Sequence, residues 1–292
     1  MTPTQKANIQ LHLAVILFGF TAILGVYISL SAMVLVWWRV FITSISLLFL
    51  IRFGKNLYQL PRKLILQYMG IGLIVGLHWV CFFGSAKYSN ASISVICMAT
   101  VSFFTSMLEP LVLRTPFKWY ELALGVIIVP AIALIVNTTA ADMTLGIWIG
   151  LISAFLAALF STLNKKLIDK SDPLTITFLE LGSACLFIGL LLPAYFFMEP
   201  EANFIPQKMD FFYLIILALL CTTFAYVISL KALNHVTAYA ANLVYNLEPV
   251  YGIILAIILL EENKDLSVSF YLGGSIIILS IFCYPFIKKR LS

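Results

Sequence analysis

The chain has 292 residues, of which 62% are hydrophobic and only 11% are charged, and its mean hydropathy is +1.04. Because soluble domains usually carry about 25% charged residues, this composition excludes a soluble globular protein and predicts an all-α polytopic membrane protein. The net charge of +5 gives no reason to expect a nucleic-acid partner, since membrane topology accounts for an excess of basic residues.

The sequence contains no motif of the common enzyme or metal-binding classes. It has no Walker loop, no nucleophile elbow and no cluster with metal-ligand spacing. Five cysteines are scattered through apolar segments and are interpreted as small buried side chains: Cys81, Cys97, Cys185, Cys221 and Cys283. We therefore expect a protein that is not an enzyme and that needs neither a metal nor a cofactor.

The apolar stretches, taken in chain order, predict ten transmembrane helices. Roughly 20 helical residues, which rise 1.5 Å each, cross a hydrocarbon core of about 30 Å. The predicted spans are Ile9–Leu30, Met33–Ile51, Leu64–Phe83, Ser92–Leu113, Trp119–Val136, Leu145–Leu163, Leu174–Phe197, Phe211–Leu230, Ala238–Leu260 and Phe270–Ile287.

Lysine and arginine residues are distributed unevenly between the two sides of these spans. With the N-terminus in the cytoplasm, the inner segments hold 14 of them, the outer loops hold 3, and Arg39 lies within a span. Positive residues concentrate in the cytoplasmic loops of membrane proteins. The distribution supports ten spans and predicts a multi-pass protein of the cytoplasmic (inner) membrane with both termini in the cytoplasm.

An internal repeat divides the chain into two halves, residues 1–140 and 141–292. GSAKYSNASISV (Gly84–Val95) resembles SLKALNHVTAYAA (Ser229–Ala241), and ELALGVII (Glu121–Ile128) resembles FYLGGSII (Phe270–Ile277), with a shift of 146 to 148 residues. Each half holds five spans, an odd number, so the two five-helix repeats are predicted to be inverted relative to each other. Inverted repeats of this kind place a substrate site near the membrane midplane.

The stretch from Ala238 to Leu260 is the strongest candidate for a cavity-lining helix. On a helix its polar residues share an arc about 120° wide, with Glu248 at the edge; they are Tyr239, Asn242, Tyr245, Asn246 and Pro249. Polar groups facing lipid cost several kcal/mol, so this face should meet protein, water or substrate. Pro249 removes a backbone donor and predicts that the helix is broken.

Arg39, Glu180 and Glu248 are charged residues that lie well inside predicted spans, away from the span ends. A charge near the bilayer centre costs roughly 2.5–3.5 kcal/mol on insertion scales, so each is expected to face the bundle interior. Glu180 and Arg39 differ by about 12 Å in depth, which makes Glu248 the preferred partner of Arg39. The alternative is that these charges only hold helices together.

Other polar residues have two interpretations each. His78 is either a packing residue or a proton carrier, and Trp79 is either an interface aromatic or a gate. Ser102 lies on a polar face of the fourth span, where hydroxyl groups either contact substrate or bond one helix to another. Glu109 on the same face is close enough to the inner boundary to extend toward the interface.

The motifs above resemble those of the EamA family of the drug/metabolite transporter superfamily. In the second half the resemblance rests on ALNHVTAYAANLVYNLEPVYGIILAIILLEE (Ala232–Glu262) and GGSIIIL (Gly273–Leu279). In the first half it rests on HWVCFFGSAKYSNASISV (His78–Val95) and LEPLVLRTPFKWYELALG (Leu108–Gly125). The first half departs from the pattern, because Arg114-Thr115-Pro116 stands where an acidic turn is expected.

The resemblance implies ten helices with the fifth and tenth at the periphery, and secondary transport, often export, of amino acids or related metabolites. We expect a small-molecule substrate, protons as a possible coupling ion, and lipid contact; the sequence leaves the oligomeric state open. Uncoupled facilitation and a role as a membrane sensor or assembly protein remain alternatives. The expected substrate-binding residues are Arg39, His78, Trp79, Ser102, Glu180, Tyr239, Asn242, Tyr245, Asn246 and Glu248.

Overall fold

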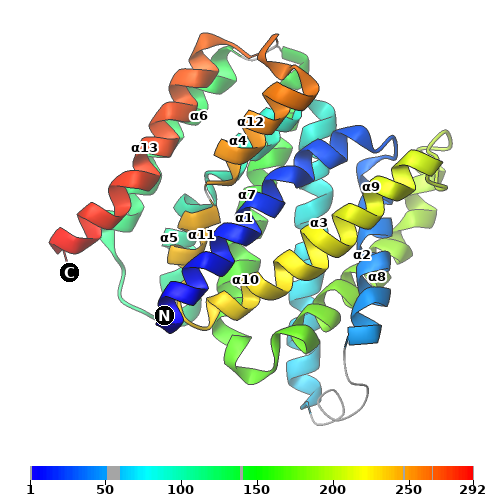
Figure 1. Cartoon of the computed structure of the whole chain (residues 1–292), viewed down its shortest axis with the longest axis horizontal. Helices are drawn as coiled ribbons and strands as arrows, with labels where there is room; N and C mark the ends of the chain where they lie inside the picture. The colour runs from blue at the N-terminus through cyan, green and yellow to red at the C-terminus, as the bar shows by residue number, and fades with distance from the viewer. Residues whose placement is uncertain (1, 51–59, 139–140, 246, 265, 292) are drawn as a thin grey trace.

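A computed structural model describes residues 2–50, 60–138, 141–245, 247–264 and 266–291. Within these ranges the regular structure is helical, and the helices pack as one bundle (Figure 1). The helices are α1 (Pro3–Tyr27), α2 (Ala32–Leu50), α3 (Arg62–Tyr88), α4 (Ala91–Met98), α5 (Val101–Leu113), α6 (Trp119–Thr138), α7 (Thr144–Leu167), α8 (Pro173–Met198), α9 (Lys208–Ala218), α10 (Ala225–Leu233), α11 (Ala238–Tyr245), α12 (Glu248–Leu260) and α13 (Val268–Leu291). A π-helical turn, η4 (Leu219–Phe224), joins α9 to α10.

Each predicted span overlaps a helix or a consecutive pair of helices. Seven helical segments in the described ranges are long and apolar enough to cross a membrane, and three further apolar helices are shorter, namely Trp119–Ile128, Glu248–Leu260 and Val268–Ser280. The chain is thus a multi-pass helical membrane protein, while the count of ten crossings stays a prediction. Large apolar side chains such as Leu190 and Phe197 are 80% and 88% exposed, as expected of a surface that meets lipid.

Helix starts follow from local sequence. In α1, Thr2 accepts a hydrogen bond from the Gln5 amide and Pro3 occupies the first turn, where its missing N–H is harmless. In α8, the Asp172 carboxylate accepts from the Thr175 amide, and Pro173 follows it in the same way. These caps satisfy amides that the first turn of a helix leaves without a partner.

Two of the spans are broken helices with matching proportions. α4 has 8 residues and α5 has 13; α11 has 8 and α12 has 13, and each boundary of the second pair lies 147 residues after its counterpart. Both pairs end at a residue in the left-handed conformation, Arg114 (φ 56°) and Glu261 (φ 57°). This agrees with the 146 to 148 residue shift of the sequence repeat.

The breaks have different local causes. Before α12, the Leu247 amide donates to the carbonyl of Val244, which closes a tight turn, and Pro249 lies in the first turn of the next helix. The break predicted from Pro249 is therefore confirmed. Between α4 and α5, the Thr100 amide and hydroxyl both donate to the carbonyl of Cys97. A hydroxyl that bonds to nearby backbone in this way competes with helix continuation.

The broken helices lie antiparallel in the middle of the bundle. α4 packs on α12 toward one end, and α5 packs on α11 toward the other (Figure 1). α7 contacts both α4 and α5, whereas α1 contacts α12 and α11. α6 and α13 pack together at one edge of the molecule, left of the other helices in Figure 1. This arrangement brings the two breaks close to the centre.

Candidate functional site

A cavity of about 90 Å³ lies among the middle portions of the helices, next to both breaks. Because a water takes up about 30 Å³ in the liquid, a cavity of this volume has room for a few waters or a small ligand. Its wall is mainly aromatic and apolar, with a few polar groups, as is typical of small-molecule sites. The lining residues are Phe18, Thr21, Arg39, His78, Trp79, Phe82, Met98, Val101, Ala157, Phe160, Ser161, Tyr226, Ser229, Tyr245 and Glu248.

Arg39 on α2 is the cation of the cavity, and its side chain is only 1% exposed. Its Nε donates to Thr222 Oγ1 at 2.7 Å, and its Cζ lies 3.9 Å from the centre of the Trp79 ring. Such a stack attracts a cation to the negative face of the indole. Trp79 therefore supports the guanidinium within the cavity.

Glu248 is the carboxylate of the same cavity. It occupies the first turn of α12 and is 8% exposed. The partial positive charge at a helix N-terminus stabilises a carboxylate placed there. In the described ranges, the ion pairs within 4.0 Å join Lys118 to Glu121 and Lys264 to Glu261, so Arg39 and Glu248 share the cavity without a direct ion pair.

Glu180 lies behind the cavity wall. Its side chain is 0% exposed, and its Oε2 accepts from the Tyr226 hydroxyl at 2.5 Å and from Asn164 Nδ2 at 3.3 Å. Glu180 Oε1 has no hydrogen-bond partner among the described residues. Tyr226 itself lines the cavity, so its side chain lies between Glu180 and the cavity and bonds to Glu180.

His78 lines the cavity but is held against α7. Its Nδ1 lies 2.9 Å from both the carbonyl and the hydroxyl oxygen of Ser153, and the same hydroxyl is 3.0 Å from the His78 carbonyl. A carbonyl only accepts, so the bond to the Ser153 carbonyl assigns the proton to Nδ1. This geometry favours the packing interpretation of His78, with Nε2 as its remaining acceptor.

The polar residues predicted on the ninth span are separated by the structure. Tyr245 lines the cavity, and its hydroxyl is hydrogen-bonded to that of Ser229. Tyr239 does not line it; its ring is 1% exposed and packs with Leu124 of α6. The Asn242 side chain and the whole of Asn246 lie outside the described residues.

Ser102 is also buried away from the cavity lining. It is 2% exposed, and its hydroxyl lies 3.4 Å from the carbonyl of Ala99 at the break between α4 and α5. Of the predicted residues, the structure thus brings five together around one cavity: Arg39, His78, Trp79, Tyr245 and Glu248.

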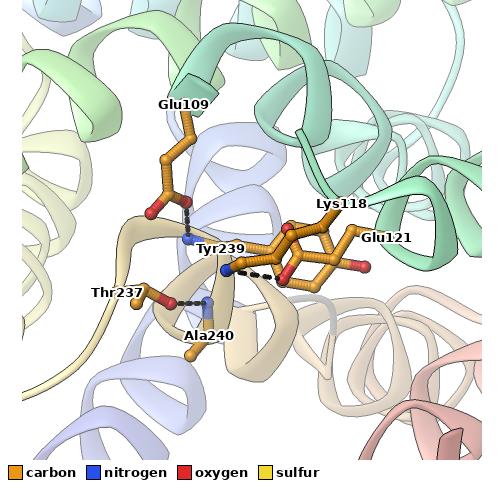
Figure 2. Close-up of polar contacts among 6 residues, drawn as sticks. All are labelled: Glu109, Lys118, Glu121, Thr237, Tyr239 and Ala240. Atoms are coloured by element: carbon orange, nitrogen blue, oxygen red, sulfur yellow. Dashed lines mark hydrogen bonds and ion pairs between the residues drawn. The ribbon is translucent and has the colours of Figure 1, made fainter. Parts of the chain in front are cut away.

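Two glutamates that were not predicted as site residues cap the broken helices of the opposite repeat. Glu262, directly after α12, accepts from the Ala91 and Ser92 amides at 3.0 Å each and from the Ser92 hydroxyl at 2.6 Å. Glu109 on α5 accepts from the Tyr239 amide at 2.6 Å, and Figure 2 shows it pointing at the first turn of α11. Each broken helix is therefore fixed at its N-terminus by the other half of the chain.

The environment of Glu109 differs from the expectation that it extends toward the interface. Its side chain is 6% exposed, because it is directed at α11 rather than outward. In Figure 2, Lys118 and Glu121 lie beside the Tyr239 ring and form an ion pair of 3.3 Å. The helix start is completed by Thr237, whose hydroxyl accepts from the Ala240 amide at 3.0 Å.

Sequence patterns also missed Thr222 and Tyr226. Thr222 and Thr223 follow Cys221 inside an apolar span, and two adjacent hydroxyls there were a usable sign of a polar contact. Tyr226 lies four residues after Thr222, on the same helical face. Both residues contact buried charges, Arg39 and Glu180 respectively, and only the fold reveals these contacts.

Comparison with known proteins gives a family and a fold. The sequence model of the EamA-like transporter family matches residues 5–137 and again residues 144–284, which together span most of the chain. Among solved structures, a crystal structure of a protein with 12% identity superimposes with a TM-score of 0.71 over 99% of both chains. At that identity the likeness concerns the fold alone. No curated protein matches the chain.

Proposed function

We propose that this chain, which belongs to the EamA-like transporter family, is a secondary active transporter that exports a small metabolite such as an amino acid. Membership makes it a multi-pass membrane transporter of small molecules, in a family of transporters rather than enzymes. The proposal adds the cytoplasmic membrane, ten spans in two inverted five-helix repeats, residues 1–140 and 141–292, and both termini in the cytoplasm. α1 begins and α13 ends toward the same side of the bundle in Figure 1, which supports placing both termini on one side of the membrane.

The observation that carries the proposal is an aromatic cavity holding a cation and a carboxylate that do not pair with each other. Isolated charges inside a membrane protein are costly, and they persist where a ligand or ion uses them. In our proposal Arg39 binds a substrate carboxylate, and Glu248 binds a substrate ammonium group or a proton. Trp79 and Tyr245 form part of the wall, and the limited room of the cavity, about 90 Å³, favours a compound about the size of an aliphatic amino acid.

Alternating access is supported by the two broken helices. They contribute Met98, Val101, Tyr245 and Glu248 to the cavity, and their N-terminal halves are held at opposite ends of the bundle by Glu262 and Glu109. Inverted repeats with broken helices at the site are characteristic of secondary transporters. Releasing one cap while the other holds would open the cavity to one side of the membrane.

The test is transport in proteoliposomes containing the full chain, screened with the common amino acids as radiolabelled probes. Glu248→Gln and Arg39→Gln should each reduce flux of a transported probe at least tenfold, whereas Glu261→Gln, at an exposed surface pair, should leave it unchanged. Unchanged flux in the first two variants would exclude the proposed binding roles. Flux of no probe by the wild type would exclude amino acids as substrates.

An uncoupled facilitator is the second candidate, because the cavity by itself does not require an ion. An imposed pH gradient separates the two: a proton-coupled transporter accumulates probe above its equilibrium level, and a facilitator only equilibrates it. Under coupling, Glu248→Gln should equilibrate the probe without accumulating it. A sensor or assembly protein would bind a probe without moving it, and the chain's family makes that alternative the weaker one.

A further inference from the structure

A polar stripe on α2 faces the π-helical turn η4. Arg39, Thr43 and Ser46 are spaced four and three residues apart, so they lie on one face of α2. Arg39 Nε bonds to Thr222 Oγ1 at 2.7 Å, the Thr43 hydroxyl donates to the Ala218 carbonyl at 3.1 Å, and the Ser46 hydroxyl lies 2.9 Å from that of Thr223. All three side chains of the stripe therefore contact one short segment, residues 218–223.

The π-helical turn is stabilised by its own threonines. The Thr222 hydroxyl donates to the carbonyl of Leu217 at 2.6 Å, and the Thr223 hydroxyl donates to that of Ala218 at 3.0 Å, in each case five residues back. The wider turn of a π-helix shifts the register of the residues after it, and such turns are rare and concentrate at functional sites.

The geometry around Thr222 leaves its hydroxyl one orientation. Its proton is committed to the Leu217 carbonyl, so a lone pair faces Arg39 Nε. The guanidinium is held at Nε by Thr222 and across its face by Trp79. Among the described residues, Thr222 is the hydrogen-bond partner of Arg39, and no carboxylate oxygen lies within 4.0 Å of the guanidinium nitrogens.

We propose that Thr222, within η4, orients Arg39 through this contact and is a positioning residue for recognition of a carboxylate on the substrate. With Nε and the ring face engaged, the two terminal nitrogens have no hydrogen-bond partner among the described residues and can donate to an anion that enters the cavity. A planar pair of N–H donors matches the two oxygens of a carboxylate. The inference rests on the proposed transport function, in which Arg39 binds a substrate carboxylate, and adds the residue that orients Arg39 for it.

The transport test compares Thr222→Val, which keeps the side-chain shape but removes the acceptor, with Thr222→Ser, which restores it. Thr223→Val is the matched control, because it removes a neighbouring hydroxyl of the same turn without touching Arg39. For a transported amino acid, Thr222→Val should raise KM about tenfold with little change in the maximal rate, as expected for loss of a hydrogen bond to a charged group. Thr222→Ser and Thr223→Val should stay within about twofold of the wild type.

A competitor that lacks the carboxylate tests whether Arg39 recognises that group of the substrate. If leucine is transported, 3-methylbutylamine has the same body and ammonium group without the carboxylate. Its inhibition constant should be equal for the wild type and Thr222→Val, while the KM for leucine rises. An unchanged KM, or an equal rise for Thr222→Val and Thr223→Val, would overturn the positioning role and leave transport itself intact.

A second measurement does not depend on transport. In nitrogen-15 NMR spectra of the full chain in nanodiscs, the Arg39 Nε–H is assigned by its absence in Arg39→Lys. Its proton should exchange slowly with water in the wild type, Thr222→Ser and Thr223→Val, and rapidly in Thr222→Val. Slow exchange in Thr222→Val would refute the orienting role even if the wild type transported no amino acid, so the two proposals fail separately.

Discussion

Replacing Glu262 with alanine is the sharpest test of how the two halves of the chain are held together. The carboxylate is 6% exposed and accepts three hydrogen bonds, two from amides and one from a hydroxyl, at the start of α4. Ala91 and Ser92, which supply them, are themselves 1% and 0% exposed. The alanine variant therefore leaves two buried amides without an acceptor.

The magnitude follows from these contacts. A buried donor left unsatisfied costs about 1–3 kcal/mol, and the helix dipole adds up to about 1 kcal/mol at a partly buried N-terminus. Asn90 still caps the Ile93 amide in the variant, so the start of α4 keeps one of its acceptors. Two such amides and the dipole together give an expected loss of about 2–7 kcal/mol, which at about 2 °C for each kcal/mol lowers the unfolding temperature by roughly 4–14 °C.

The assay is thermal unfolding of the purified chain in detergent, followed by intrinsic fluorescence. Glu261→Ala is the matched control: its neighbouring carboxylate pairs with Lys264 where the two side chains are 68% and 69% exposed, and such pairs contribute about 0–1 kcal/mol. Glu262→Gln should fall between the wild type and Glu262→Ala. If Glu262→Ala unfolded within about 1 °C of Glu261→Ala, the cross-repeat cap would contribute nothing and the argument would be wrong.

Four further variants test helix packing and buried hydrogen bonds. Gly72→Ala should abolish recovery of monodisperse protein in size-exclusion chromatography, because the added Cβ overlaps the carbonyl oxygen of Glu180. Gly70→Ala is its control: a Cβ there meets open space, so the variant should be as stable as the wild type or more stable by about 0.5–1 kcal/mol. Glu109→Ala removes the acceptor of one hydrogen bond, where Glu262→Ala removes the acceptor of three, and should cost about 1–2 kcal/mol in thermal unfolding, less than Glu262→Ala. Tyr226→Phe removes the shorter of two bonds to Glu180 and should cost about 1–3 kcal/mol; an unchanged unfolding temperature would mean that Glu180 needs no donor from Tyr226.

Much of the helical arrangement followed from sequence because the physics involved is local. Length and hydropathy place helices in all ten predicted stretches, and Pro249 predicts the break before α12. The break between α4 and α5 was not predicted, since Pro110, the proline of that span, lies inside α5 without ending it. The hydroxyl of Thr100 marks this break instead, and threonine occurs in many unbroken helices.

The candidate site was predicted less completely, because a helical arc does not identify the neighbour that each side chain meets. Tyr239 and Tyr245 lie six residues apart, at opposite edges of an arc about 120° wide. That width allows Tyr245 to reach the cavity while Tyr239 packs on α6. The three predicted charges are all buried in the bundle, since a charge within a span has few alternatives to the interior; Arg39 and Glu248 line the cavity, whereas Glu180 lies behind its wall.

The capping glutamates show how far symmetry in the sequence extends. At the shift of 147 residues that relates the two broken helices, Glu262 corresponds to Thr115, which has no carboxylate. Glu109, six residues earlier, caps the opposite repeat instead, and it does so with one bond where Glu262 makes three. The acidic turn missing from the first half is therefore replaced from inside α5, by a residue that no repeat alignment pairs with Glu262. Because the two caps hold by unequal numbers of bonds, the inward- and outward-opening movements of the proposed alternating access would break different contacts, even though the backbone of the broken helices repeats closely.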